Sequence, residues 1–230
     1  MKLLLSKRSL LNLKPTRRIT KSHCSITGKK PSKKTGNTHR FESTLERDYI
    51  TLLEFDDQVD YYVEQPVTIH YLHDGNDRIY TPDFLVVYKS SANIKPLLSE
   101  IKYKLDLQLH EAEYEPKFNA AIRFAEENGY QFSVITEDSI RNVCLKNYDF
   151  LNRYIHQEVN IEHASLLLTS LMGLEESTPE ALIAKCGTTV NHKGELLYAL
   201  WQLVAKRDIS CDLKVPITMI SKIWINPFLK

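Results

Sequence analysis

The chain has 230 residues, of which 43% are hydrophobic, and its net charge is +1. That length allows one large domain or two small ones with a full core, and no apolar run approaches the roughly 20 residues that span a membrane. Four scattered cysteines without a C-x-x-C pair argue against a zinc cluster or a disulfide framework and favour a reducing cytoplasm, and the charged first segment is not typical of a secretory signal.

The basic residues are concentrated at the start of the chain. Residues 1–41 hold 12 Lys or Arg and no Asp or Glu, which leaves 18 basic and 29 acidic residues, a net charge of −11, in the remainder. Polar composition with little periodicity predicts an arm over residues 1–40. Such an arm can contact the phosphates of a nucleic acid, and the alternative is a solvated tail that contacts nothing.

Residues 41–55 are predicted to form a helix with an acid on its apolar side. Glu46, Tyr49, Ile50 and Leu53 follow the i, i+3, i+4, i+7 rule and therefore share one face. A carboxylate on a buried stripe is unfavourable unless it meets a cation or a metal ion.

A strand-rich region follows, between residues 57 and 103. Two strands divided at Pro66 precede a turn at 73–77, a strand over 78–88, a polar loop and a strand over 97–103. A helical stretch over 106–128, broken near Pro116, then leads to a buried strand over 130–138. Because the last two strands flank a helix, they are predicted to run parallel.

The pattern changes near residue 160 to short helices. Segments 161–173, 177–187 and 192–207 are predicted helices, and the β-like end of the chain predicts a hairpin. Three helices and a hairpin indicate a winged-helix-like domain. We therefore divide the chain into a basic arm (1–40), a first domain (41–155) and a C-terminal domain (156–230).

Three charged residues stand where the pattern asks for burial. Asp83 begins one core strand, and alternation places Glu100 and Lys102 on the same side of the next, with Ile101 facing away. If the strands pair as neighbours, Asp83 approaches Glu100. Two adjacent carboxylates do not both ionise near pH 7 without a cation, and carboxylate oxygens are what Mg²⁺ prefers. Glu46 is the natural third acid.

This arrangement resembles the PD-(D/E)xK nuclease superfamily over about residues 41–140, through Pro82-Asp83 and Glu100-Ile101-Lys102. A closer resemblance is to the TnsA family. It is carried by the segments Ser43-Thr44-Leu45-Glu46, Glu64-Gln65-Pro66, YTPDFLV (80–86), the E-x-K triplet and FSVITED (132–138). It implies an α/β (α+β) fold, with a restriction-endonuclease-like mixed sheet flanked by helices and a winged-helix-like C-terminal domain.

The resemblance also implies a function. TnsA proteins are endonuclease subunits of heteromeric cut-and-paste transposases. They cleave the 5′ ends of transposon DNA, beside a DDE-type transposase, TnsB, and an AAA+ regulator, TnsC. We expect the same partners here, with no membrane association, in the cytoplasm of a bacterium at the nucleoid.

The matched motifs assign the site. Glu46, Asp83 and Lys102 are the implied catalytic residues, and Glu100 is the acid beside the lysine. We expect Asp83, Glu100 and the Ile101 carbonyl to hold one Mg²⁺, for which Mn²⁺ can substitute, and Glu46 with Asp83 to hold any second ion. Lys102 would orient the attacking water or neutralise the phosphate.

The following helix lacks an acid that some members of the family place there. Ala121 stands at about the expected position. Nearby acids occur earlier on this helix, at Glu111, Glu113 and Glu115, and the sequence assigns none of them to the site.

Plainer alternatives accompany each assignment. Asp83 could be a turn residue, Glu100 and Lys102 an exposed pair, and Glu46 a surface acid. The same fold also serves restriction and repair nucleases, and the chain could instead be a non-catalytic DNA-binding or scaffold subunit. Candidate DNA contacts, which could equally be solvated or structural residues, are Lys29, Lys30, Lys33, Lys34, His39, Arg40 and Gln65.

Overall fold

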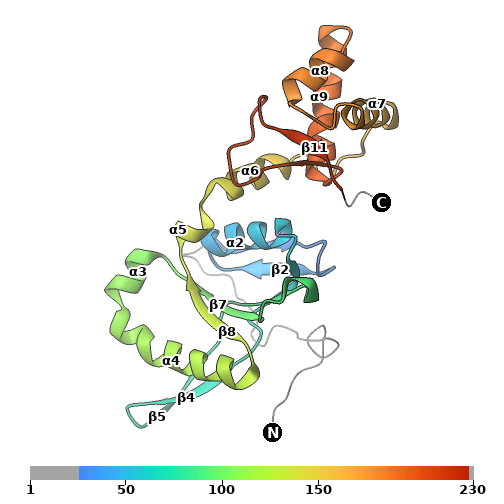
Figure 1. The fold of residues 1–230 in the computed structure, drawn as a ribbon. Coiled ribbons are helices and arrows are strands. Elements are labelled where there is room, and N and C mark those ends of the chain that lie inside the picture. Colours follow the sequence, from blue (N-terminus) through green and yellow to red (C-terminus); the bar gives the residue numbers. More distant parts are fainter. Residues whose placement is uncertain (1–25, 228–230) are drawn as a thin grey trace. The chain divides into compact units, whose positions relative to one another are not determined.

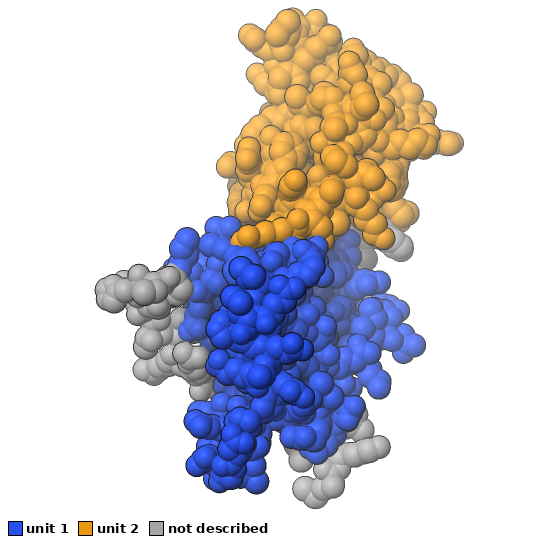
Figure 2. Space-filling model, turned by 90° about the vertical axis from the view of Figure 1, so that its left-hand side faces the viewer, with its two compact units in different colours: residues 1–140 blue, residues 141–230 orange. Residues whose placement is uncertain are grey.

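The computed structural model describes residues 26–227, so the first 25 residues of the predicted arm lie outside the described part. The chain divides into two compact units, residues 1–140 and 141–230, which Figure 2 distinguishes by colour. Among the described residues, no helix has both the length and the apolar character needed to cross a membrane.

The first unit contains eight strands and four α-helices within its described residues. In chain order these are β1 (Gly28–Pro31), β2 (Thr38–Phe41), α2 (Thr44–Phe55), β3 (Val59–Glu64), β4 (Ile69–His73), β5 (Asn76–Tyr80), β6 (Phe84–Tyr88), β7 (Leu97–Ile101), α3 (Lys104–Leu109), α4 (Glu111–Asn128), β8 (Gln131–Ile135) and α5 (Glu137–Ile140), with a short 3-10 turn at Ser90–Ala92.

A four-stranded mixed sheet in the order β3-β6-β7-β8 forms the centre of this unit. β6 pairs antiparallel with both β3 and β7. β7 and β8 pair in parallel, with Glu100 opposite Val134, so the parallel pair predicted from the sequence is confirmed. The helical crossover through α3 and α4 is what allows these two strands to run in the same direction.

The two faces of the sheet are covered by different helices (Figure 1). Tyr61, Leu85 and Leu98 belong to a buried cluster that includes Ala121 of α4. The intervening residues face the other way, and there the Phe84 ring packs edge-on against Tyr49 of α2, with ring centres 5.5 Å apart. Because side chains alternate along a strand, each charged residue of the sheet is committed to one of these two faces.

Two predicted boundaries in this unit are wrong. The segment 78–88 is not one strand: β5 pairs with β4 in a separate hairpin, and only β6 joins the central sheet. The break in the helical stretch lies at His110, whose φ of −123° interrupts the helix, while Pro116 lies inside α4. Pro116 is the sixth residue of α4 and cannot donate a backbone hydrogen bond there, yet the helix continues through it.

Residues 26–40 of the predicted arm form most of the hairpin β1–β2, in which Gly28 pairs with Phe41, the first residue of the predicted domain. The hairpin is tied to α2 and the strand after it. The Lys34 ammonium donates to the carbonyl oxygens of Asp56 and Val59, and Ser32 donates to Glu54. Lys34 thus ties the turn between β1 and β2 to the connection between α2 and β3.

The second unit holds the C-terminal helices and a small sheet. Its elements are α6 (Val143–Leu151), α7 (Ile161–Met172), β9 (Glu176–Ser177), α8 (Pro179–Cys186), α9 (Val190–Ala205), β10 (Ile209–Cys211) and β11 (Ile223–Ile225). The three predicted helices and the hairpin are confirmed, and β9 joins the hairpin to give the strand order β10-β11-β9. Thr178 caps α8, as its position before Pro179 predicts. Trp201 is buried in this unit and packs against Phe150 of α6.

Candidate active site

Asp83 and Glu100 meet at one end of the central sheet. Phe84 pairs with Ser99, so the residue before β6 lies opposite Glu100, on the face of the sheet that α4 covers. The Ile101 N–H donates to Asp83 Oδ2 at 2.7 Å. The predicted approach of the two acids is therefore confirmed, and it follows from strand register.

Glu100 is the most enclosed member of the cluster, with 3% of its surface exposed. The Tyr80 hydroxyl donates to its Oε2 at 2.7 Å. The Lys102 ammonium lies 3.0 Å from its Oε1, and the Lys117 ammonium 3.9 Å from the same atom. Both carboxylate oxygens thus have partners, and the predicted placement of Glu100 and Lys102 on one side of β7 is confirmed.

The charges in this cluster are strongly coupled. Burial, and then the like charge of Glu100, raise the pKa of Asp83 well above its ordinary value, against the opposing effect of Lys102. Burial alone would lower the pKa of Lys102, but the carboxylates of Glu100 and Asp83 outweigh it and raise that pKa. Displaced pKa values that arise from burial together with specific charges are typical of functional sites.

Glu46 lies in the first turn of α2, where it takes part in capping the helix. Its backbone N–H donates to the Ser43 hydroxyl at 3.1 Å, and that hydroxyl donates to Glu46 Oε1 at 2.9 Å. Its Oε2 accepts the Glu42 N–H at 2.8 Å. Ser43 and Glu46 thus form a variant of the capping box, which is a structural reason for an acid at this position.

Glu46 also belongs to the electrostatic neighbourhood of the other three residues. Its pKa is raised by burial, with the hydrogen bonds from Glu42 and Ser43 and the charge of Lys102 acting in the opposite direction. Its charge in turn contributes to the raised pKa of Asp83. Glu46 thus contributes to the electrostatics of Asp83 and Lys102, and its role as a catalytic residue stays a prediction.

Two family models match the chain one after the other. Residues 56–137 match the model described as "TnsA-like endonuclease N terminal", and residues 139–213 match "TnsA endonuclease C terminal". Together they span most of the sequence, including Asp83, Glu100 and Lys102. The chain belongs to the TnsA endonuclease family. A sequence comparison with curated proteins found no match.

Membership of the TnsA family makes the chain an endonuclease subunit of a Tn7-type transposase, which works on DNA within a larger complex. The mixed α/β architecture with a central sheet agrees with the restriction-endonuclease-like fold of TnsA. The restriction-type nuclease and the non-catalytic scaffold are therefore the less favoured interpretations.

The oxygen atoms of this TnsA site suit a divalent cation, although no three acidic, His or Cys side chains in residues 26–227 form a ready-made metal cluster. Asp83 and Glu100 supply two hard carboxylate ligands whose mutual repulsion a cation would relieve. The Lys102 ammonium already contacts both Glu100 Oε1 and the Ile101 carbonyl, the latter at 3.4 Å. A positive charge is thus favoured at this position.

The candidate DNA contacts lie in varied surroundings. Lys29 and Lys33 are exposed, whereas Lys30, Lys34 and Arg40 are partly buried. His39 is only 3% exposed, with Nδ1 against Glu64 Oε2, so its ring faces the protein interior. A role of these residues in binding DNA stays a prediction.

Gln65 supports the site through its backbone. Its N–H donates to the Asp83 carbonyl at 2.7 Å, and its φ of 45° lies in the left-handed region. A non-glycine residue holds that conformation only where the surrounding structure demands it. Gln65 therefore helps to fix the chain at Asp83, whereas its side chain is buried.

Sequence reasoning missed Tyr80 and Lys117, both of which contact Glu100. Tyr80 lies three residues before Asp83 in a strand-like run, and nothing in that pattern distinguishes it from a residue of the hydrophobic core. A signal for Lys117 was present: it stands four residues before Ala121, and residues four apart in a helix share a face.

Proposed function

We propose that this chain is a Mg²⁺-dependent endodeoxyribonuclease that hydrolyses the phosphodiester at the 5′ ends of transposon DNA during cut-and-paste transposition. The observation that carries the proposal is the coupled cluster of Asp83, Glu100 and Lys102 at the end of the sheet, in a chain whose family is TnsA. Mn²⁺ would substitute for Mg²⁺, since both accept oxygen ligands.

Asp83, Glu100 and the Ile101 carbonyl would hold one cation, and Glu46 with Asp83 any second one. When bound, such an ion lowers the pKa of a water ligand and offsets charge on the phosphate. Lys102 has a raised pKa and stays protonated near neutral pH, so it is suited to neutralise the phosphate and not to accept a proton. The buried Tyr80 hydroxyl orients the Glu100 carboxylate by its hydrogen bond.

The proposal includes partners and a place of action. A DDE-type transposase, TnsB, would cut the opposite strand, and an AAA+ ATPase, TnsC, would regulate both enzymes. These events would take place on the chromosomal DNA of a bacterium, in its cytoplasm. An isolated TnsA subunit is expected to cut DNA poorly until its transposase partner is present.

The test replaces the central acid. Asp83→Ala should lower strand cleavage at 5′ transposon ends by about 1,000-fold or more. The cation would lose a ligand, and without a bound cation the phosphate would lose its main counter-charge. Cleavage is measured on end-labelled transposon DNA with the partner transposase, in Mg²⁺, in Mn²⁺ and in EDTA. Wild-type cleavage that persists in EDTA, or an Asp83→Ala protein that cuts normally, would show that the proposal is wrong.

A further inference from the structure

Lys117 is a second cation at the candidate active site. It lies in the second turn of α4, its side chain is 20% exposed, and its ammonium is 3.9 Å from Glu100 Oε1. The same oxygen is 3.0 Å from the Lys102 ammonium. One carboxylate oxygen therefore has two ammonium groups within reach.

Aromatic rings hold Lys117 in this position. Its Nζ lies 4.0 Å from the centre of the Tyr114 ring and 5.5 Å from those of Tyr80 and Phe118. An ammonium over the face of a ring is attracted to it, and the attraction grows when water is excluded. Tyr80 serves twice, because its hydroxyl also donates to Glu100 Oε2. The rings and the carboxylate together restrict where the ammonium can lie.

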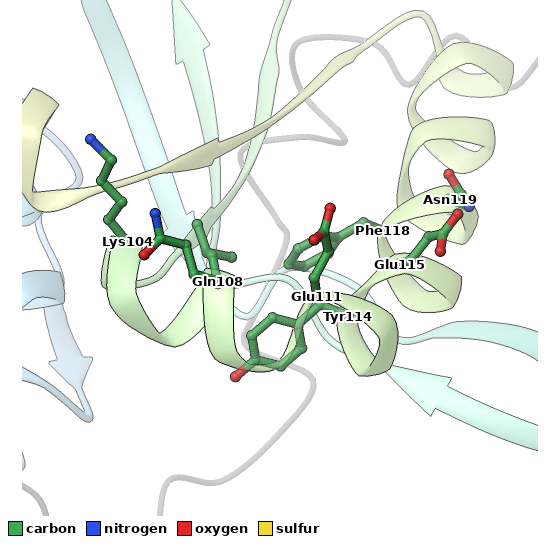
Figure 3. Close-up of a pocket in the computed structure, with 8 residues that line it drawn as sticks. Lys104, Gln108, Glu111, Tyr114, Glu115, Phe118 and Asn119 are labelled. Atoms are coloured by element: carbon green, nitrogen blue, oxygen red, sulfur yellow. The ribbon is translucent and has the colours of Figure 1, made fainter.

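The helix explains why the lysine faces the sheet. Ala121, four residues later, is fully buried against the sheet. Because residues four apart lie on the same helix face, Lys117 also faces the sheet, near the end that holds Glu100. Tyr114 and Phe118 lie on successive turns of α4 and also line an open pocket of about 470 Å³, whose other residues come from α3 and α4 (Figure 3). Glu111 and Glu115 line that pocket, so it does not suit a phosphate.

We infer that Lys117 is a positioning residue of the nuclease site, which holds the Glu100 carboxylate in place and competes with a divalent cation for its Oε1 atom. The inference rests on the proposed function. A cation that takes Glu100 as a ligand must displace positive charge from the same oxygen, and two like charges at one site repel. Lys117 then weakens cation binding and, by fixing Glu100, improves the geometry of the bound site.

These two effects have opposite signs, which separates a positioning role from a merely structural one. In Lys117→Met, the apparent affinity for Mn²⁺, measured by calorimetry on the full chain without DNA, should rise about 10-fold. Cleavage of transposon ends with the partner transposase, at saturating Mn²⁺, should fall about 10-fold. Lys117→Arg keeps the charge and the ring contact, and should stay within about 3-fold of wild type in both measurements.

Every other pattern overturns the inference. A fall in both quantities would indicate damage to the fold, which thermal unfolding of each variant would confirm. No change in either, or a change in only one, would leave Lys117 without the dual role. Asp83→Ala measured in parallel tests the proposed function separately. If Asp83→Ala abolishes cleavage and Mn²⁺ binding while Lys117→Met behaves like wild type, the nuclease assignment stands and only the inference about Lys117 fails.

Discussion

Two pairs of polar side chains lie on opposite faces of the central sheet, and they differ in composition. On the α2 face, His39 contacts Glu64 through Nδ1, and the Thr35 hydroxyl lies 2.7 Å from its Nε2. On the α4 face, Asp83 and Glu100 place two acids together, and the pKa of Asp83 is raised by burial and by that like charge. Both pairs are shielded from water, yet only the second brings two carboxyl groups together.

The difference distinguishes stability from function. An acid paired with a histidine satisfies hydrogen bonds and needs nothing more from outside the protein. Two acids held together by strand register are unfavourable unless a cation joins them, and the chain supplies Lys102 and Lys117. Such an arrangement is retained where it serves a ligand or a reaction. The following predictions test this division.

The largest expected effect is on the rate of cleavage. Lys102→Met should lower cleavage at transposon ends roughly 100- to 1,000-fold, because the charge that we propose to neutralise the phosphate is lost. The matched control is Lys104→Met. Lys104 is exposed and pairs with Asp138 at 2.9 Å, so its loss should leave the rate within about 2-fold. If Lys102→Met cleaved DNA as fast as Lys104→Met, Lys102 would have no role in cleavage.

The second effect is on stability. His39→Ala should lower the free energy of unfolding by about 3 kcal/mol, since Glu64 would stay buried without its partner. Urea unfolding measures this loss, and cleavage per folded molecule should be unchanged. A double-mutant cycle with Glu64→Gln should give a coupling of about 1 kcal/mol or more. An inactive but stable His39→Ala protein would assign the pair to the reaction.

The smallest expected effect is a pH-dependent change in the free energy of unfolding. Because the folded-state pKa of Asp83 is raised, the folded protein binds a proton more readily than the unfolded chain, and ionised Asp83 destabilises the fold. In EDTA, Asp83→Asn should therefore be more stable than wild type at pH 7. The advantage should shrink as pH falls through the raised pKa and vanish below the ordinary value of about 3.8. Urea unfolding at several pH values checks this, and an advantage independent of pH would contradict it.

Much of the candidate site could be predicted from the sequence because its residues lie on regular elements. Alternation along β7 placed Glu100 beside Lys102, and the helix crossover predicted the parallel pair β7–β8. Glu46 was found by helical periodicity, yet that pattern did not indicate its hydrogen bonds to Ser43 and Glu42. The separation of β5 from β6 was also missed, because propensity alone does not tell which sheet a strand joins.

The sequence by itself determined the chemistry of this TnsA protein: the acids, the lysine, the order of the elements and the basic start of the chain. Only the tertiary structure decided which charged side chains contact one another. Lys117 reaches Glu100, and His39 turns inward to Glu64, through contacts between segments 17 and 25 residues apart. Local periodicity fixes the face on which a side chain lies, but its partner depends on how separate elements pack, which no single segment encodes.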